Sequence, residues 1–238
     1  MVSGRLTSDN GIEHYRIDGV EQLEPFLMTV VSDSNLWMFI SSTGALTAGR
    51  VDADHALFPY ETDDRIHHAV GVSGPVTVIA RTISGTRELW RPFSRELTAQ
   101  CTRSISKSVL GDRLIFEERH LGWGIGFRST WAPSRSHGWI RTVEVIGHDD
   151  HDIDLEVLDG VIDVMPAGVD ALTEQIRSNR VNAYKRSEVG PWGTLAVFSV
   201  ESLLTDRAEP AESLTATIVW SSGFPDADID LDARSVAA

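Results

Sequence analysis

Apolar runs broken by turn residues recur along this sequence, and they predict strands. Leu36–Ser41 is the clearest, because an apolar run of this length bounded by Ser-Ser and Gly44 is typical of a buried or half-buried β-strand. In Asp152–Met165 apolar and acidic residues alternate, which predicts a strand with one face in water. A short lead-in strand is expected before the turn at Asp18-Gly19. Similar patterns predict strands at residues 26–31, 69–82, 103–110, 113–119, 123–131, 138–147, 193–204 and 213–220.

One segment has helical spacing instead. Val169, Leu172 and Ile176 are apolar while Glu174 and Arg177 lie opposite, which predicts a helix over residues 169–177. The polar stretch 178–188 could extend this helix or return over the sheet.

Many short strands with one or two helices predict a mainly β fold, an antiparallel β-sandwich. No repeat of fixed period is present, which disfavours a propeller. We assign residues 1–220 to a single sandwich domain and residues 221–238, which are acidic, to a tail or truncated linker.

After Gly44 the periodicity stops, and the sequence predicts a long polar loop that runs to His68. Its apolar centre, Leu57–Tyr60, argues against disorder. Because long ordered loops are usually functional, we expect a binding or interface loop here.

Composition and charge limit the classes of partner and the cellular location that we expect for this chain. The chain has 238 residues and is 42% hydrophobic with seven Trp, which is ample for a core. Its formal charge of −14, from 21 Lys+Arg against 35 Asp+Glu, disfavours a nucleic-acid partner because phosphate binding needs a basic face.

The single cysteine, Cys101, excludes an intrachain disulfide. Without an apolar leader or a long apolar run, we expect neither secretion nor membrane spanning, and the cytoplasm is the default.

Two acidic clusters are candidates for a metal site or a catalytic site. The run from His148 to Asp152 has metal-ligand types, but its spacing fits no known metal motif, so a solvated turn is favoured and no metal or other cofactor is expected. Glu117 and Glu118 are neighbours on a predicted strand and therefore point to opposite faces. They cannot act together on one bond, and no catalytic residue is assigned.

Aromatic residues give the remaining indication. Sugars present apolar C–H faces and hydroxyl edges, so their sites combine an aromatic ring with charged and polar hydrogen-bonding groups. The polar loop offers this combination, and core packing explains most of the tryptophans. The predicted substrate-binding residues are Arg50, Asp52, Tyr60, Asp63 and Asp64.

Several long stretches together resemble a known family. They are SSTGALTAGRVDADHALFPYETDD, ELWRPF, LIFEERHLGWGIGFRSTW, DLEVLDGVIDVMPAGV, VNAYKRSE and DRAEPAESLTATIVWS. The resemblance is to the N-terminal region of bacterial proteins similar to cellobiose and chitobiose phosphorylases, in the clan of inverting glycoside phosphorylases and hydrolases. It covers residues from about Ser34 to Trp220.

The resemblance implies a β-supersandwich related to galactose-mutarotase-like folds. In that family an (α/α)6 barrel follows the sandwich and holds the catalytic acid and the phosphate-binding residues, so none of these is carried over to this chain. The expected role is a non-catalytic, carbohydrate-associated domain that forms a rim of the sugar site. Its expected partners are the barrel, as a domain or a subunit, and a second copy in a homodimer.

Two other functions stay open. A free-standing mutarotase-like enzyme would pair Glu117 or Glu118 with His55, His67 or His120 as acid and base. A structural interaction module would instead show a large exposed apolar patch.

Overall fold

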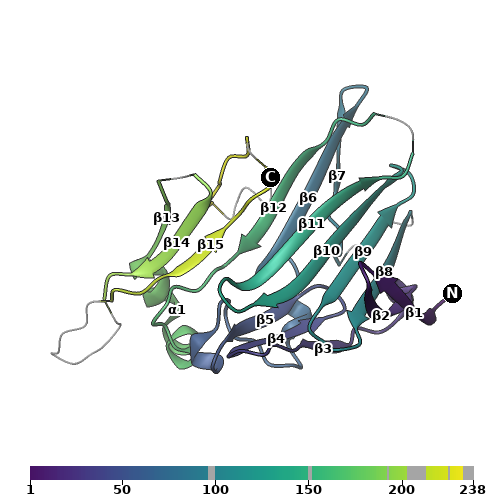
Figure 1. Ribbon diagram of the computed structural model, residues 1–238. Coiled ribbons are helices and arrows are strands. Elements are labelled where there is room, and N and C mark those ends of the chain that lie inside the picture. Colours follow the sequence, from purple (N-terminus) through teal and green to yellow (C-terminus); the bar gives the residue numbers. More distant parts are fainter. Residues whose placement is uncertain (96–99, 150–151, 192, 203–212, 225, 233–238) are drawn as a thin grey trace.

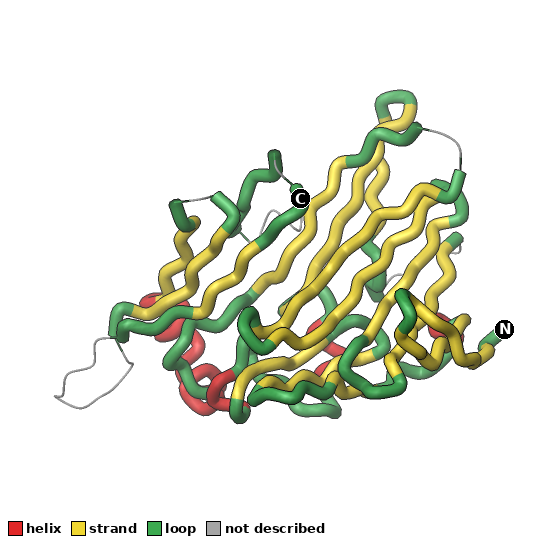
Figure 2. The backbone as a smooth tube through the Cα atoms, in the orientation of Figure 1, coloured by secondary structure: helices red, strands yellow, loops and turns green. Residues whose placement is uncertain are grey.

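The computed structural model describes residues 1–95, 100–149, 152–191, 193–202, 213–224 and 226–232. Over these residues the strands form four antiparallel sheets, and the one α-helix is α1 (Ala171–Tyr184). The predicted mainly β, sandwich-like fold is therefore confirmed. Figures 1 and 2 show the long strands side by side, with a shorter sheet beneath them and α1 at one side.

The largest sheet has six strands in the order β1-β2-β8-β9-β10-β11. Its last four strands are consecutive in the chain, so the meander expected from the turns at Gly111-Asp112 and Gly122 is present. The sequence predicted one strand before Asp18, but the structure has two, joined at Asn10-Gly11. The six strands are β1 (Ser3–Asp9), β2 (Ile12–Asp18), β8 (Cys101–Ser108), β9 (Leu114–His120), β10 (Ile125–Ser134) and β11 (Gly138–Gly147).

A second sheet corrects the predicted long loop. β4 (Leu36–Ser41) pairs with β3 (Leu27–Val30) on one side and with β5 (Leu46–Arg50) on the other. The sequence placed β5 inside the loop, which is wrong. All of β5 except Arg50 is buried, so its two faces show no alternation that sequence reading could detect. The loop therefore begins after Arg50.

Two three-stranded sheets complete the fold, in the orders β12-β6-β7 and β13-β14-β15. β7 and β13 were not predicted as separate strands. The strands are β6 (Gly74–Ile83), β7 (Thr86–Trp90), β12 (Glu156–Ile162), β13 (Lys185–Val189), β14 (Leu195–Val200) and β15 (Thr217–Trp220), and the short 3-10 helices are η1 (Val20–Gln22), η2 (Ala53–His55) and η3 (Ile66–Ala69). Residues 203–212, which carry the predicted acidic connection, lie outside the described part.

The helix α1 starts close to its predicted place but runs further. Asp170 caps it, because its side chain accepts a hydrogen bond of 2.6 Å from the backbone N–H of Thr173. The backbone departs from helical geometry at Arg177, where the predicted helix ended, and then continues to Tyr184. The polar stretch 178–188 thus extends the helix first and then forms β13.

The main core joins three of the four sheets. Met38 and Ile40 of β4, Leu46 of β5, Ile79 of β6 and Leu114 of β9 are each at most 2% exposed. Because these residues come from three different sheets, those three sheets pack on a common interior, while Val200 of β14 and Val181 of α1 belong to a second, smaller cluster. Burial of this kind contributes about 1.5–3 kcal/mol for each large apolar side chain.

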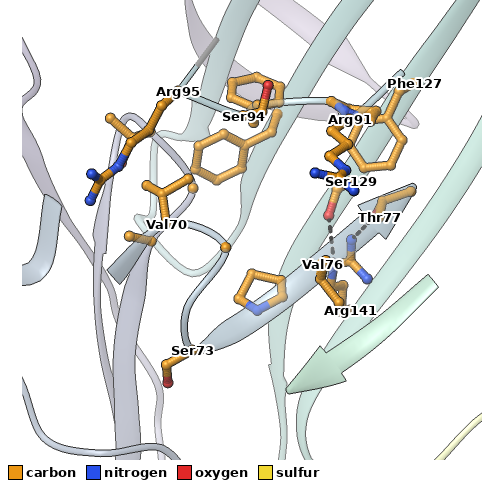
Figure 3. A pocket seen from close by; sticks show the side chains of 18 of the residues that line it. Val70, Ser73, Val76, Thr77, Arg91, Ser94, Arg95, Phe127, Ser129 and Arg141 are labelled. Atoms are coloured by element: carbon orange, nitrogen blue, oxygen red, sulfur yellow. Dashed lines mark hydrogen bonds between the residues drawn. The ribbon is translucent and has the colours of Figure 1, made fainter. Parts of the chain in front are cut away.

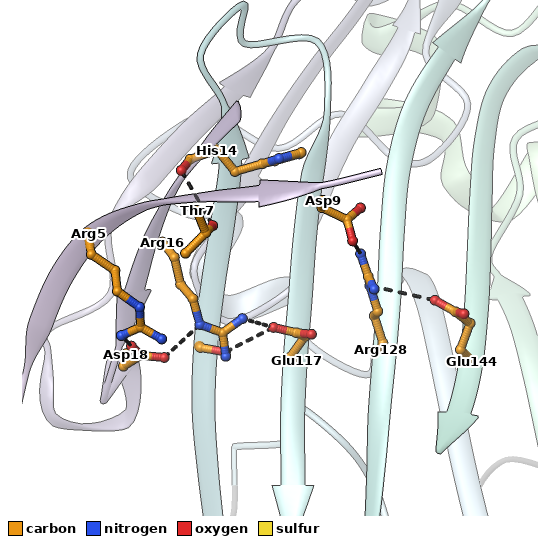
Figure 4. Close-up of polar contacts among 10 residues, drawn as sticks. Arg5, Thr7, Asp9, His14, Arg16, Asp18, Glu117, Arg128 and Glu144 are labelled. Carbon is orange, nitrogen blue, oxygen red and sulfur yellow. Dashed lines mark hydrogen bonds and ion pairs between the residues drawn. The ribbon is translucent and has the colours of Figure 1, made fainter. Parts of the chain in front are cut away.

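β1 and β2, the first two strands of the large sheet, curl over its outer face so that the end of β1 reaches β10 (Figure 4). Asp9 at the end of β1 pairs with Arg128 on β10 at 2.7 Å, and Arg16 on β2 pairs with Glu117 on β9. Burial by itself would raise the pKa of Asp18, but hydrogen bonds and charge from Arg16 and Arg5 outweigh it and hold that pKa below its usual value. The outer face is thus tied together by balanced charges rather than by apolar packing.

Candidate functional site

A cavity of about 330 Å³ lies between the inner face of the large sheet and the start of β6. Strands β9, β10 and β11 form one wall. The other walls come from three short segments, residues 43–45, 70–73 and 91–95. Figure 3 shows Phe127, Ser129 and Arg141 on one side of the cavity, with Val70 and Arg95 across from them.

Four aromatic side chains from the described part of the chain line this cavity. Phe116, Phe127 and Trp131 are buried on the inward face of β9 and β10, where alternation along each strand places them. Phe93, from the 91–95 segment, meets the ring of Phe116 edge-on with 5.1 Å between ring centroids. The cavity therefore has a rigid apolar surface of ring faces and edges.

Hydrogen-bonding groups occupy the β11 side. The Arg141 guanidinium donates to both carboxylate oxygens of Asp159 on β12, each at 2.9 Å. It also donates to the Thr77 hydroxyl at 2.8 Å and to the Ser129 hydroxyl at 3.2 Å. Arg141 thus fixes two hydroxyl groups at the cavity wall and joins the large sheet to the β12-β6-β7 sheet.

Hydrogen bonds to the buried Glu118 carboxylate hold the 91–95 segment in place. This carboxylate, 2% exposed, accepts hydrogen bonds from the backbone N–H of Phe93 at 2.7 Å and from the Trp90 indole at 2.8 Å. Its ion pair with Arg103 is 2.7 Å long, and Arg103 also donates to the Ser94 carbonyl at 2.9 Å. Phe93 has φ of 57°, which is uncommon for a residue other than glycine. Such strained backbone persists where its surroundings over-determine it, as Glu118 and Arg103 do here.

His120 lies beside this buried pair. Its ring stacks on Trp123 with 4.9 Å between centroids and an interplanar angle of 25°, and it meets Trp90 edge-on. Burial lowers the pKa of His120 below its ordinary value of 6.5, and the charge of Arg81 lowers it further, while Glu118 opposes both. His120 is therefore a neutral packing residue near neutral pH.

This lowered pKa predicts a pH dependence of stability. As the pH falls below about 6.5, the unfolded chain takes up a proton at His120 while the folded chain does not, so the free energy of unfolding falls until the folded pKa is reached. We expect His120→Gln to reduce this fall, measured by urea unfolding at several pH values between about 7.5 and 5. His137→Gln is the matched control, since His137 is exposed and contacts the hydroxyls of Ser134 and Ser136. An unchanged slope in His120→Gln would contradict the prediction.

The predicted loop residues lie away from the cavity, and none of the five lines it. Asp52 caps η2 and contacts His55 at 2.7 Å, so its carboxylate serves the local turn. The Tyr60 ring packs edge-on against Trp37 with centroids 6.2 Å apart. Arg50 reaches the Asn35 side chain at 3.4 Å. Asp63 and Asp64 are exposed in the turn before η3. Tyr60 and the Asp52 carbonyl, which accepts from the Trp37 indole at 3.0 Å, thus both contact Trp37, while the other two aspartates stand apart.

The same loop also supports α1. The Asp54 carboxylate accepts from the backbone N–H of Ala171, the first residue of α1, at 3.2 Å. The backbone N–H of Met165 donates to the Leu57 carbonyl at 2.9 Å. The loop is therefore ordered, and part of it connects the β3-β4-β5 sheet to the helix.

The glutamate–histidine pairs of the mutarotase-like alternative are not brought together as an exposed site. Glu117 faces outward to Arg16, and Glu118 faces inward, as alternation requires. His67 contacts the Ser41 hydroxyl at 2.6 Å, and His55 contacts Asp52. Glu118 and His120 do share the inner face of β9, but both are buried and the carboxylate is engaged by three donors.

Sequence reasoning missed the cavity. Its lining comes from segments far apart in the chain, and the polar residues, such as Ser129 and Thr77, are single hydroxyls inside strands. The one available signal was Arg141, a charged residue among the inward positions of β11. Alternation would mark it as a buried cation that needs a partner.

No protein-family model matches this sequence, and no curated protein matches it. Within the described residues, no group of three or more His, Cys, Asp or Glu is placed to hold a metal ion. The predicted turn from His148 to Asp152 falls partly outside them, because residues 150–151 are not described. The described helices include none long and apolar enough to cross a membrane.

Proposed function

We propose that this chain is a non-catalytic carbohydrate-binding β-sandwich domain that acts beside a separate catalytic (α/α)6 barrel. The cavity is the observation that carries the binding role. At about 330 Å³ it lies in the size range of small-molecule sites. Aromatic rings such as Trp131 suit the C–H faces of a sugar, and the Ser129 hydroxyl suits its edges, whereas the Thr77 hydroxyl donates its proton to Asp159.

The lining favours binding over catalysis. Among the described residues that line the cavity there is no Asp, Glu or His. Proton transfer to or from a sugar usually needs one of these side chains within hydrogen-bond reach. A binding role therefore fits this cavity better than the mutarotase-like alternative. The barrel partner and a homodimer are supported by the family resemblance.

Substitutions that fill the cavity or remove a hydrogen-bonding group from it test the binding role. Val76→Trp should occupy space beside Arg141, and Ser129→Ala removes one hydroxyl, so we expect each to weaken sugar binding about tenfold or more. Affinity for a panel of charged and uncharged mono- and disaccharides would be measured by calorimetry, with quenching of Trp emission as a second readout.

The loop provides the comparison for this experiment. Tyr60→Ala and Asp64→Ala change residues that do not line the cavity, so they should leave the affinity unchanged. Weaker binding in these two variants alone would move the sugar site to the loop. If no sugar of the panel binds the unaltered chain, the proposed function is wrong.

A further inference from the structure

The charge of the cavity differs from that of the chain as a whole. The chain carries −14, yet the described lining residues include three arginines and no carboxylate. The arginines are Arg91, Arg95 and Arg141. A net negative protein repels anions at long range, so a locally cationic cavity needs a specific explanation.

Arg141 has a positioning role in this cavity. Its ion pair with Asp159, in which the two side chains are 10% and 18% exposed, balances its charge. Because Arg141 donates to the Ser129 oxygen, the proton of that hydroxyl is directed elsewhere. Ser129 is thereby set as a hydrogen-bond donor at a wall that it shares with Arg91.

Arg91 and Arg95 come from the segment that Glu118 fixes. Figure 3 shows Arg91 on the same side of the cavity as Ser129 and Phe127, and Arg95 near Val70. Arg95 lies at the rim and donates to the His68 carbonyl at 2.5 Å. The strained backbone at Phe93, tied to Glu118, holds both arginines at the cavity.

We propose that the cavity recognises an acidic group, a carboxylate or a phosphate, carried by its sugar ligand. This inference rests on the proposed carbohydrate function and names the ligand class. Arg91 and the Ser129 hydroxyl contact the acidic group, since guanidinium and hydroxyl donors match its oxygens, and the aromatic rings contact the sugar. Arg95 adds positive charge at the entrance.

The test compares matched ligands on the whole chain. Methyl glucuronide and glucose 6-phosphate supply the two acidic groups, methyl glucoside and glucose are their neutral counterparts, and inorganic phosphate lacks the sugar. We expect at least one acidic sugar to bind about tenfold or more tightly than its neutral counterpart. The preference should shrink as salt is raised, because salt screens the attraction between charges. Comparing the two acidic sugars identifies the group.

Arginine variants test whether the preference for acidic over neutral sugars arises at the cavity. Arg91→Met should reduce the ratio of acidic to neutral affinity about 10- to 100-fold, and Arg91→Lys should keep part of it. Arg135→Met is the matched control, because it removes the same charge from an exposed residue that does not line the cavity. The ratio is insensitive to a small loss of folded protein.

Each outcome separates the two proposals. Equal affinity for acidic and neutral sugars would overturn the acidic-ligand inference and leave the carbohydrate function standing. An acidic preference that persists unchanged in Arg91→Met, or that falls equally in Arg135→Met, would also overturn the inference. No binding of any sugar, or phosphate alone binding as tightly as glucose 6-phosphate, would overturn the carbohydrate function itself.

Discussion

Replacing Glu118 by alanine is expected to lower the free energy of unfolding by about 3–5 kcal/mol, because it leaves a buried guanidinium without its carboxylate. Arg103 is the residue left unpaired, and its side chain is 11% exposed. The backbone N–H of Phe93 and the Trp90 indole lose their acceptor in the same substitution. Urea unfolding followed by circular dichroism measures the change.

Glu117, which neighbours Glu118 on the opposite face of β9, provides the control for Glu118→Ala. Glu117 belongs to the same strand but pairs with Arg16 on the outer face, where the two side chains are 29% and 25% exposed. Glu117→Ala should therefore cost only about 1 kcal/mol or less. The double variant Glu118→Met/Arg103→Met should recover part of the loss, because no unpaired charge remains. A Glu118→Ala variant as stable as Glu117→Ala would show that the buried pair is not the anchor we describe.

Removing Arg141 should have the second largest effect, lowering the free energy of unfolding by about 2–4 kcal/mol. Arg141→Met deprives Asp159 of a two-oxygen contact and leaves the Thr77 and Ser129 hydroxyls without their shared donor. The loss is expected to exceed that of an exposed ion pair because the Arg141 side chain is 10% exposed.

A double-mutant cycle of Arg141→Met with Asp159→Asn isolates the interaction energy of these two residues from the effects of their other contacts. If the two residues act through their mutual contact, the double variant should be more stable than the sum of the single changes predicts. Arg135→Met, whose partner Asp33 is exposed, should change stability by less than about 1 kcal/mol. Strictly additive effects of Arg141→Met and Asp159→Asn would contradict the proposed link between β11 and β12.

The sequence predicted the bounds of two strands of the large sheet closely. β11 (Gly138–Gly147) has the predicted bounds, and β9 differs from its prediction by one residue at each end. In β11 the alternation of apolar and polar residues records which face is inward. The same rule placed Glu117 and Glu118 on opposite faces, as the structure does.

Prediction failed where a segment is buried on both faces or gains order from distant partners. Apart from its last residue, Arg50, β5 is made of small and apolar residues and is buried on both faces, so it carries no alternation. Within the loop that follows, Asp54 and Leu57 are ordered by contacts to residues more than a hundred positions later. A local pattern cannot report such contacts.

The sequence by itself determined the mainly β class, most of the strands and the absence of a local catalytic motif. These features depend on residue types within a few positions of one another. Only the tertiary structure decided that Arg91, Ser129 and Arg141 meet at one cavity and that the predicted loop residues do not line it. The reason is physical: strand pairing and sheet packing set which distant inward-facing side chains become neighbours, and many pairings are compatible with the same alternation.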